Sequence, residues 1–186
     1  MAGIGHNNGP TMEAGESWRR HAWGKARAKL MPVLPIEVVR MRVKRAGEIG
    51  LDYRTYASIR AASGHDVIAF LYSTNALRML QAKAPLPEDR AAKLAATEAG
   101  RAALARRPVT PEHLLQAAQG LLDHAAEAPR AFANWGESRK ILLQAIQSQK
   151  WPADRVVMVG DTAEERDWAQ AARLAFYLPA ERYFAA

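Results

Sequence analysis

Residues 156–178 read VVMVGDTAEERDWAQAARLAFYL and are the most informative stretch for the architecture. Val156 to Val159 form an apolar run that ends at Gly160-Asp161. Such a run is typical of a strand that is buried on both faces of a parallel sheet. An alanine-rich helical pattern begins near Glu164 and leads into a second apolar run, 174–178. The pattern predicts a strand, a helix and a parallel strand, and ligands of such sheets bind at the carboxyl ends of the strands, where Asp161 would lie.

Two upstream segments fit the same interpretation, in the expected order. Residues 64–75 read GHDVIAFLYSTN, an apolar strand that ends in Ser73-Thr74-Asn75. Residues 138–145 read SRKILLQA and precede the Gly-Asp segment by about one helix. Together with Gly160-Asp161, these segments resemble the second, third and fourth motifs of the haloacid-dehalogenase-like (HAD) phosphohydrolases. The resemblance covers about residues 50–80 and 136–184.

The resemblance implies a role for each segment. In that family the hydroxyl of the second motif hydrogen-bonds the transferring phosphoryl group, here Thr74. The Lys or Arg of the third motif neutralises phosphate charge, here Lys140, and the Gly-Asp helps to hold Mg²⁺, here Asp161. Ser73, Asn75 and Thr162 would then complete a ligand-binding site.

The first motif of the family is absent. That motif is Asp-x-Asp at the end of a strand upstream of the threonine, and it supplies the nucleophile and the general acid. The only aspartates before Thr74 are Asp52 and Asp66, and neither follows an apolar strand with a second aspartate two residues on. An aspartyl intermediate requires a carboxylate in line with phosphorus, so the family's route of hydrolysis is not expected.

Composition limits the other classes of function. The chain has 186 residues, of which 49% are hydrophobic, and is long enough for one domain with a substantial core. It has no cysteine, which excludes disulfides and thiolate chemistry and is compatible with the cytoplasm, the location we expect. No apolar run approaches the about 20 residues of a membrane span, and no secretory signal is recognisable at the N-terminus. We therefore expect no membrane association.

Positive charge is concentrated in residues 17–63. This basic region has eleven Lys or Arg residues against three acidic ones, in a chain whose net charge is +7. A basic helical region on a nearly neutral domain suggests a polyanionic partner such as nucleic acid. The residues expected to contact it are Arg40, Arg42, Lys44, Arg45 and Arg54. A solvated basic helix face is the alternative interpretation.

The chain divides into segments by composition. Residues 1–16 predict a flexible tail, 18–30 a basic amphipathic helix, 35–48 a second helix ended by Gly50, and 53–62 a third helix capped by Asp52 and stopped by Gly64. The last two helices have the outline of a helix-turn-helix, although we favour simple packing of the third helix, with Tyr56 and Ile59 inward. Residues 81–135 predict a helical insertion that would act as a cap, cover the sheet or meet a partner.

The sequence therefore predicts an α/β protein with a three-layer, Rossmann-like (HAD-like) parallel sheet over residues 64–186, incomplete at its first strand. The favoured function is a degenerate, non-catalytic protein that binds an anionic ligand, such as a phosphorylated small molecule, or a macromolecular partner. One alternative is a Mg²⁺-dependent phosphatase that uses Asp66 or Asp52 irregularly as its nucleophile. Another is nucleic-acid binding through residues 17–63. A protein partner or a homo-oligomer is compatible with all three.

Overall fold

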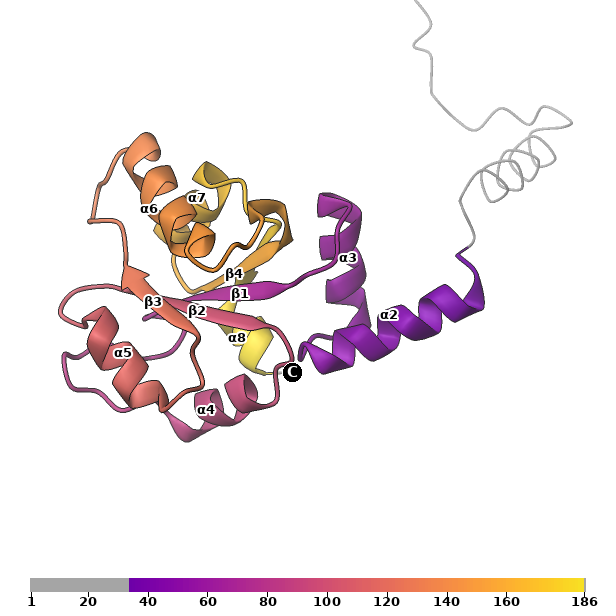
Figure 1. The fold of residues 1–186 in the computed structure, drawn as a ribbon, viewed down its shortest axis with the longest axis horizontal. Helices are drawn as coiled ribbons and strands as arrows, with labels where there is room; N and C mark the ends of the chain where they lie inside the picture. Colours follow the sequence, from indigo (N-terminus) through magenta and orange to yellow (C-terminus); the bar gives the residue numbers. More distant parts are fainter. Residues whose placement is uncertain (1–33, 186) are drawn as a thin grey trace, which may run out of the picture. The chain divides into compact units, whose positions relative to one another are not determined.

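The computed structural model describes residues 34–185, and the expected tail (1–16) and first basic helix (18–30) lie outside this range. The chain divides into two compact units, residues 1–39 and 40–186. Of the first unit, the described residues 34–39 include only the start of a helix that continues into the second. The second unit contains the sheet and is the part considered below (Figure 1).

A five-stranded parallel sheet forms the centre of this unit, in the order β3-β2-β1-β4-β5. Its strands are β1 (Ala69–Ser73), β2 (Gly100–Ala105), β3 (His124–Glu127), β4 (Val156–Gly160) and β5 (Phe176–Pro179). In the register of the central pair, Tyr72 lies opposite Val159. The polar segments that follow β1 and β4 therefore emerge side by side.

Helices alternate with the strands along the chain. They are α2 (Ile36–Glu48), α3 (Tyr53–Ser63), α4 (Glu88–Ala95), α5 (Pro111–Ala118), α6 (Trp135–Gln147), the 3₁₀ helix η1 (Ala153–Arg155), α7 (Ala163–Ala171) and α8 (Ala180–Phe184). Parallel strands require such crossover connections, because they cannot be joined by a tight turn.

Each face of the sheet has its own apolar core. Phe70 and Tyr72 of β1 pack on one face with buried residues of α3, α4, α5 and α8. Ala69 and Leu71 point to the other face, against buried residues of α6 and α7. Because β1 is covered on both sides, it is buried along its whole length, which is typical of a strand inside a parallel sheet. The arrangement is a three-layer, Rossmann-like α/β fold, as the sequence predicts (Figure 1).

Local capping signals fix several helix boundaries, among them the two ends of α3 that the sequence predicts. The Asp52 side chain accepts a hydrogen bond from the Thr55 backbone N–H at the start of α3, and Gly64 ends this helix with φ +77°. Thr110 caps α5, with Pro111 at its first position. These are positions at which a side-chain acceptor or a left-handed residue satisfies backbone groups that a helix end leaves unpaired.

The prediction of a helical insertion over residues 81–135 is wrong. This segment contains the strands β2 and β3 as well as α4 and α5, and β2 pairs directly with β1. The helix α4 ends at Ala95, and residues 100–105 (GRAALA) are a strand. Alanine favours helices locally, but the alanines of β2 are buried between two layers of helices, and tertiary packing overrides the propensity.

The predicted place of the Ser73-Thr74-Asn75 strand is also wrong. It was expected to follow an incomplete first strand, but within residues 34–185 it is itself the first strand and the central one of the sheet. Residues 36–63, which precede it, are helical. No strand precedes β1 among the described residues.

Candidate functional site

The site expected from the sequence lies where the winding of the sheet reverses. From β1 the chain moves outward to β2 and β3, then returns to the other side of β1 to form β4 and β5. In open α/β sheets, ligands bind at such a switch point, outside the carboxyl ends of the strands. Here the switch point lies between β1 and β4, and the segments that follow them are Thr74-Asn75 and Asp161-Thr162.

The hydroxyl groups at the end of β1 are engaged inside the protein. Ser73 and Thr74 are both buried. The Ser73 Oγ accepts a hydrogen bond from the Ala76 backbone N–H at 3.0 Å. The Thr74 Oγ1 accepts one from the backbone N–H of Arg106 at 3.3 Å. These groups stabilise the turn after β1 and its junction with the end of β2.

A second set of hydrogen bonds joins β1 to β4 through Glu165 of α7. This side chain is 1% exposed. Its Oε1 accepts from the Asn75 Nδ2 at 2.8 Å, and its Oε2 accepts from the backbone N–H groups of Asp161 at 2.7 Å and Thr162 at 3.1 Å. The Thr162 hydroxyl accepts in return from the Glu165 backbone N–H, which completes a capping box. The carboxylate that lies deepest in the site is therefore fully engaged.

Gly160 makes this arrangement possible. A Cβ added at Gly160 would lie 2.6 Å from the Glu165 Oε2 and 2.9 Å from the ring of Tyr177. These distances are shorter than van der Waals contact with either group. The glycine before Asp161 is thus explained by the close approach of Glu165.

Asp161 is exposed, and charged groups of both signs influence its ionisation. Burial of part of the group and the nearby Glu165 carboxylate raise the pKa of Asp161, and the guanidinium groups of Arg90 and Arg78 oppose that rise. A like charge disfavours ionisation and an opposite charge favours it. The switch point therefore combines one reachable carboxylate with two arginines.

The two arginines are functional candidates that were missed in the sequence. Arg90 is 4% exposed, and its Nε has no hydrogen-bond partner among the described residues. Its guanidinium lies 3.8 Å from the ring centroid of Phe184, and its Nε is 3.6 Å from an Asp89 carboxylate oxygen. Burial lowers the pKa of Arg90. Arg78 is exposed, with φ +55°, in the segment that follows β1. Neither lies in a recognisable motif, so the sequence offered no signal for them.

Lys140 lies on the exposed side of α6. It lies on α6 two residues after the buried Ser138 and two before the buried Leu142, and it is itself exposed. In a helix this spacing places Lys140 on the side opposite the buried residues. No contact of the described residues places Lys140 beside Asp161, so its role in neutralising a phosphate stays a prediction.

The fit of the site to Mg²⁺ is poor. Mg²⁺ prefers several convergent oxygen ligands in octahedral geometry. Asp161 is a single carboxylate, and the oxygens of Glu165 already accept three hydrogen bonds from the protein. Within residues 34–185, no group of three or more His, Asp and Glu side chains is placed to hold a metal ion.

The two aspartates considered as irregular nucleophiles have structural roles. Asp52 caps α3, and both of its carboxylate oxygens are hydrogen-bonded to Thr55. Asp66 precedes β1 and lies at the edge formed by the amino ends of the strands, opposite the carboxyl ends where Asp161 lies. It accepts a 2.7 Å hydrogen bond from the Tyr56 hydroxyl. Neither lies at the carboxyl end of a strand.

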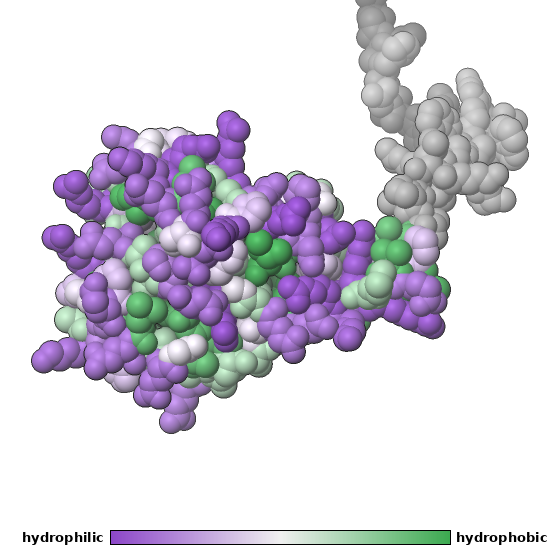
Figure 2. All heavy atoms as spheres, in the orientation of Figure 1, coloured by the Kyte–Doolittle hydropathy of each residue, from purple (hydrophilic) through white to green (hydrophobic). Residues whose placement is uncertain are grey.

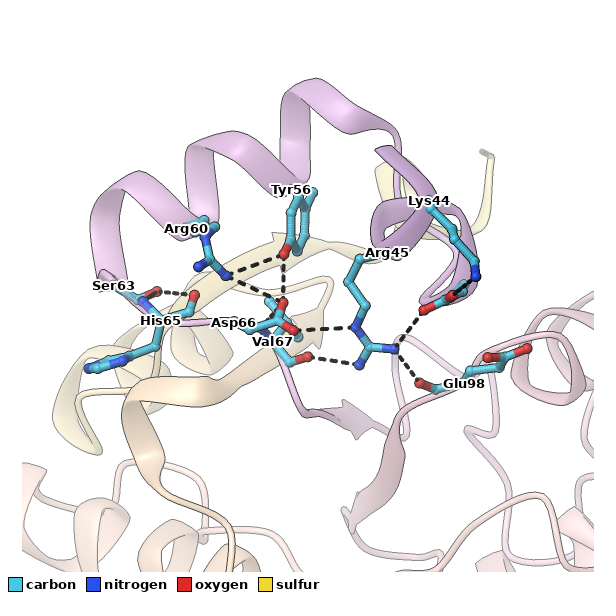
Figure 3. A network of polar contacts seen from close by, with 10 residues as sticks. Lys44, Arg45, Tyr56, Arg60, Ser63, His65, Asp66, Val67 and Glu98 are labelled. Atoms are coloured by element: carbon cyan, nitrogen blue, oxygen red, sulfur yellow. Dashed lines mark hydrogen bonds and ion pairs between the residues drawn. The ribbon is translucent and has the colours of Figure 1, made fainter. Parts of the chain in front are cut away.

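Arg45, expected to bind nucleic acid, is instead the centre of a polar network at that opposite edge (Figure 3). Its guanidinium donates to the carbonyl oxygens of Val67 and Glu98, both at 3.2 Å, and to the Glu48 carboxylate at 3.2 Å. Its Nε lies 3.4 Å from an Asp66 oxygen. Arg45 thus joins α2 to the chain entering β1 and β2, and its charge is already neutralised.

The other basic residues of this region are more accessible. The side chain of Lys44 is 81% exposed and lies 3.8 Å from the Glu48 carboxylate. Arg40 and Arg54 are exposed, and Arg42 is half-buried. As favoured from the sequence, α3 buries Tyr56 and Ile59 in the core.

Comparison of the chain with protein-family models, with curated proteins and with solved structures gave no match in any of the three. Across residues 34–185, none of the helices combines the length and the hydrophobicity needed to span a bilayer. The face visible in Figure 2 is mostly hydrophilic, with apolar areas between the charged side chains.

Proposed function

We propose that the chain is a degenerate HAD-like protein that binds an anionic ligand at the switch point and does not hydrolyse it. One observation carries this proposal. The first strand of the described sheet ends in Ser73-Thr74-Asn75, where an Asp-x-Asp motif at the end of a first strand would place its two carboxylates at positions 73 and 75. A serine and an asparagine stand there instead.

The hydrogen bonds of these residues support the absence of catalysis. A nucleophile or general acid must reach the substrate. The Ser73 hydroxyl is buried and accepts a backbone N–H, and the Asn75 amide donates to Glu165. Both side chains therefore hold the switch point together and are not directed to a reacting phosphoryl group.

The arginines support the binding of an anion. Arg78 and Arg90 both act on the pKa of Asp161, and Arg78 is exposed to solvent, where a ligand can reach it. A phosphate oxygen is a natural acceptor for a guanidinium N–H. A phosphorylated small molecule is the ligand class that matches this charge and the resemblance to phosphohydrolases.

The test has a catalytic and a binding measurement. Release of phosphate from para-nitrophenyl phosphate with Mg²⁺ is expected to stay at background in the wild type, as in Asp161→Asn and Thr74→Ala. Inorganic phosphate titrated by calorimetry is expected to bind, and Arg78→Gln is expected to weaken it about 5-fold or more. Arg155→Gln is the matched control, since Arg155 is exposed in η1 before β4, at the opposite edge. Turnover that is lost in Asp161→Asn would refute the proposal.

Nucleic-acid binding through residues 17–63 is the second candidate function. The exposure of Lys44 and Arg54 favours it, and the neutralised Arg45 no longer belongs to the contact set. This function predicts an affinity for duplex DNA that falls steeply with salt and with the Arg42→Ala/Lys44→Ala change. An affinity independent of salt would refute it.

A further inference from the structure

A groove lies beside the switch point, at the carboxyl ends of β2 and β3. It consists of two adjoining cavities of about 510 and 960 Å³. Both are lined by Arg106 and Ala131, so they adjoin at these residues. The smaller cavity is bounded by α6 and α7, and the larger one by the segments that follow β2 and β3. Their sizes match those of small-molecule sites.

Aromatic residues line the smaller cavity and its mouth. Phe132 and Trp135 line it and remain exposed, with relative exposures of 101% and 55%, while Trp168 forms a buried part of its lining. Phe132 has φ +60°, a left-handed conformation that is unfavourable for a bulky residue. The backbone is thus held so that an aromatic side chain stands in solvent at the mouth of a cavity.

The two cavities differ in charge. Arg106, Arg107 and Arg130 line the larger cavity, with Glu127 as its only acid. Glu164 and Asp167 line the smaller one, where Arg106 is the only cation. The Arg106 Nη1 lies 2.9 Å from a Glu164 oxygen, and Arg130 lies 3.6 Å from Glu137. Arg107 has no ion-pair partner among the described residues.

We propose that this groove binds a nucleotide, either free or within a single strand of nucleic acid. The base stacks on Trp135 and Phe132, since every base has a face that aromatic side chains accept. Its exocyclic amino groups face the carboxylates of Glu164 and Asp167, which accept hydrogen bonds from such groups. The phosphate lies in the larger cavity with Arg107 and Arg130. A purely anionic ligand would leave the aromatic walls unused, and a purely cationic one would leave the arginines unused.

The groove and the switch point are separate sites. The groove lies toward β2 and β3 and is lined by neither Asp161 nor Arg90. The nucleotide proposal therefore survives if the switch point binds no phosphate, and fails independently of it.

The proposal is tested by tryptophan fluorescence of the full chain. The titrants are AMP, adenosine, ribose 5-phosphate and an oligo(dA) of eight nucleotides. AMP is expected to quench the fluorescence and to bind more tightly than adenosine or ribose 5-phosphate. Because Trp135 is also a reporter, the affinities of its variants are measured by equilibrium dialysis. Phe132→Leu and Trp135→Ala are expected to weaken AMP binding about 5- to 100-fold, while Trp135→Phe retains most of it. Arg107→Ala/Arg130→Ala is expected to weaken AMP binding and to leave adenosine binding unchanged.

Arg155→Ala is the matched cation control and is expected to bind AMP like the wild type. The oligonucleotide would be identified as the source of the nucleotide if it binds more tightly than AMP, if its affinity depends on salt, and if Phe132→Leu weakens its binding as much as that of AMP. Oligonucleotide binding that is lost in Arg42→Ala/Lys44→Ala and retained in Phe132→Leu would place it on the basic helices and overturn the proposal. The proposal is also overturned if Phe132→Leu and Trp135→Ala bind AMP as tightly as the wild type does. It is overturned as well if no AMP binding is detectable at millimolar concentration.

Discussion

The side-chain amide of Asn75 donates a 2.8 Å hydrogen bond to the buried carboxylate of Glu165, and this bond ties the end of β1 to the first turn of α7. These residues are 90 positions apart in the sequence. Asn75 is part of the framework of the switch point, together with the backbone N–H groups of Asp161 and Thr162.

Glu165→Gln is expected to destabilise the protein by about 1–3 kcal/mol. An amide has a single oxygen, so part of the side chain would face the donors of Asn75, Asp161 or Thr162 with an N–H group. Urea denaturation measures the change, with Asp167→Asn as the control on the exposed side of the same helix. The assignment fails if both variants unfold at the wild-type midpoint.

Gly160→Ala is expected to cost about 1–3 kcal/mol of stability, because its Cβ would overlap the Glu165 carboxylate. Combining it with Glu165→Ala removes that overlap, so the two effects should be less than additive in a double-mutant cycle. Gly136→Ala in α6, where a Cβ would meet nothing closer than 3.5 Å, is expected to be neutral or stabilising. Strict additivity of the first pair would contradict the proposed contact.

Arg45→Ala is expected to destabilise the protein by about 1–3 kcal/mol, since it removes the donor to two backbone carbonyl oxygens and leaves Asp66 with fewer partners. Lys44→Ala removes an exposed charge from the same helix and should change stability by less than about 0.5 kcal/mol. Thermal or urea unfolding distinguishes them. Equal effects would mean that the network around Arg45 contributes nothing.

The raised pKa of Asp161 gives a pH dependence of defined sign. Its folded-state pKa lies above the ordinary value of 3.8, so the folded state binds more protons than the unfolded state between these two values. Stability from this group therefore falls as pH rises through that window and stays reduced above it. Asp161→Asn is expected to be more stable than the wild type at pH 7, with the difference vanishing below about pH 3.8. Paired denaturation curves across this range check it, and a difference that grows on acidification would contradict it.

The sequence predicts strands β1 and β4 better than strands β2 and β3. Val156–Gly160 and Ala69–Ser73 were recognisable because both are apolar runs that end in a polar turn. β2 and β3 were missed because GRAALA and HAAE are rich in alanine, and only pairing with β1 makes them strands. The capping residues Asp52, Thr110 and Gly64 act locally, so their roles could be predicted.

The site was predicted in part, for a related physical reason. The sequence placed Asp161 and Asn75 at strand ends, and the structure brings both to the switch point. It did not indicate Arg90 and Arg78, whose charges lower the pKa of Asp161, nor that Arg45 would be neutralised by groups far along the chain. Motif spacing also directed Lys140 to the site, although the helical phase of α6 turns it outward.

The most direct test of the central claim is phosphorus NMR of a phosphomonoester mixed with the protein and Mg²⁺, because one spectrum reports both binding and hydrolysis. We predict that the ester resonance broadens with the wild type, that the broadening decreases in Arg78→Gln and not in Arg155→Gln, and that no inorganic phosphate resonance develops. An inorganic phosphate resonance that grows with the wild type and is absent with Asp161→Asn would contradict the account.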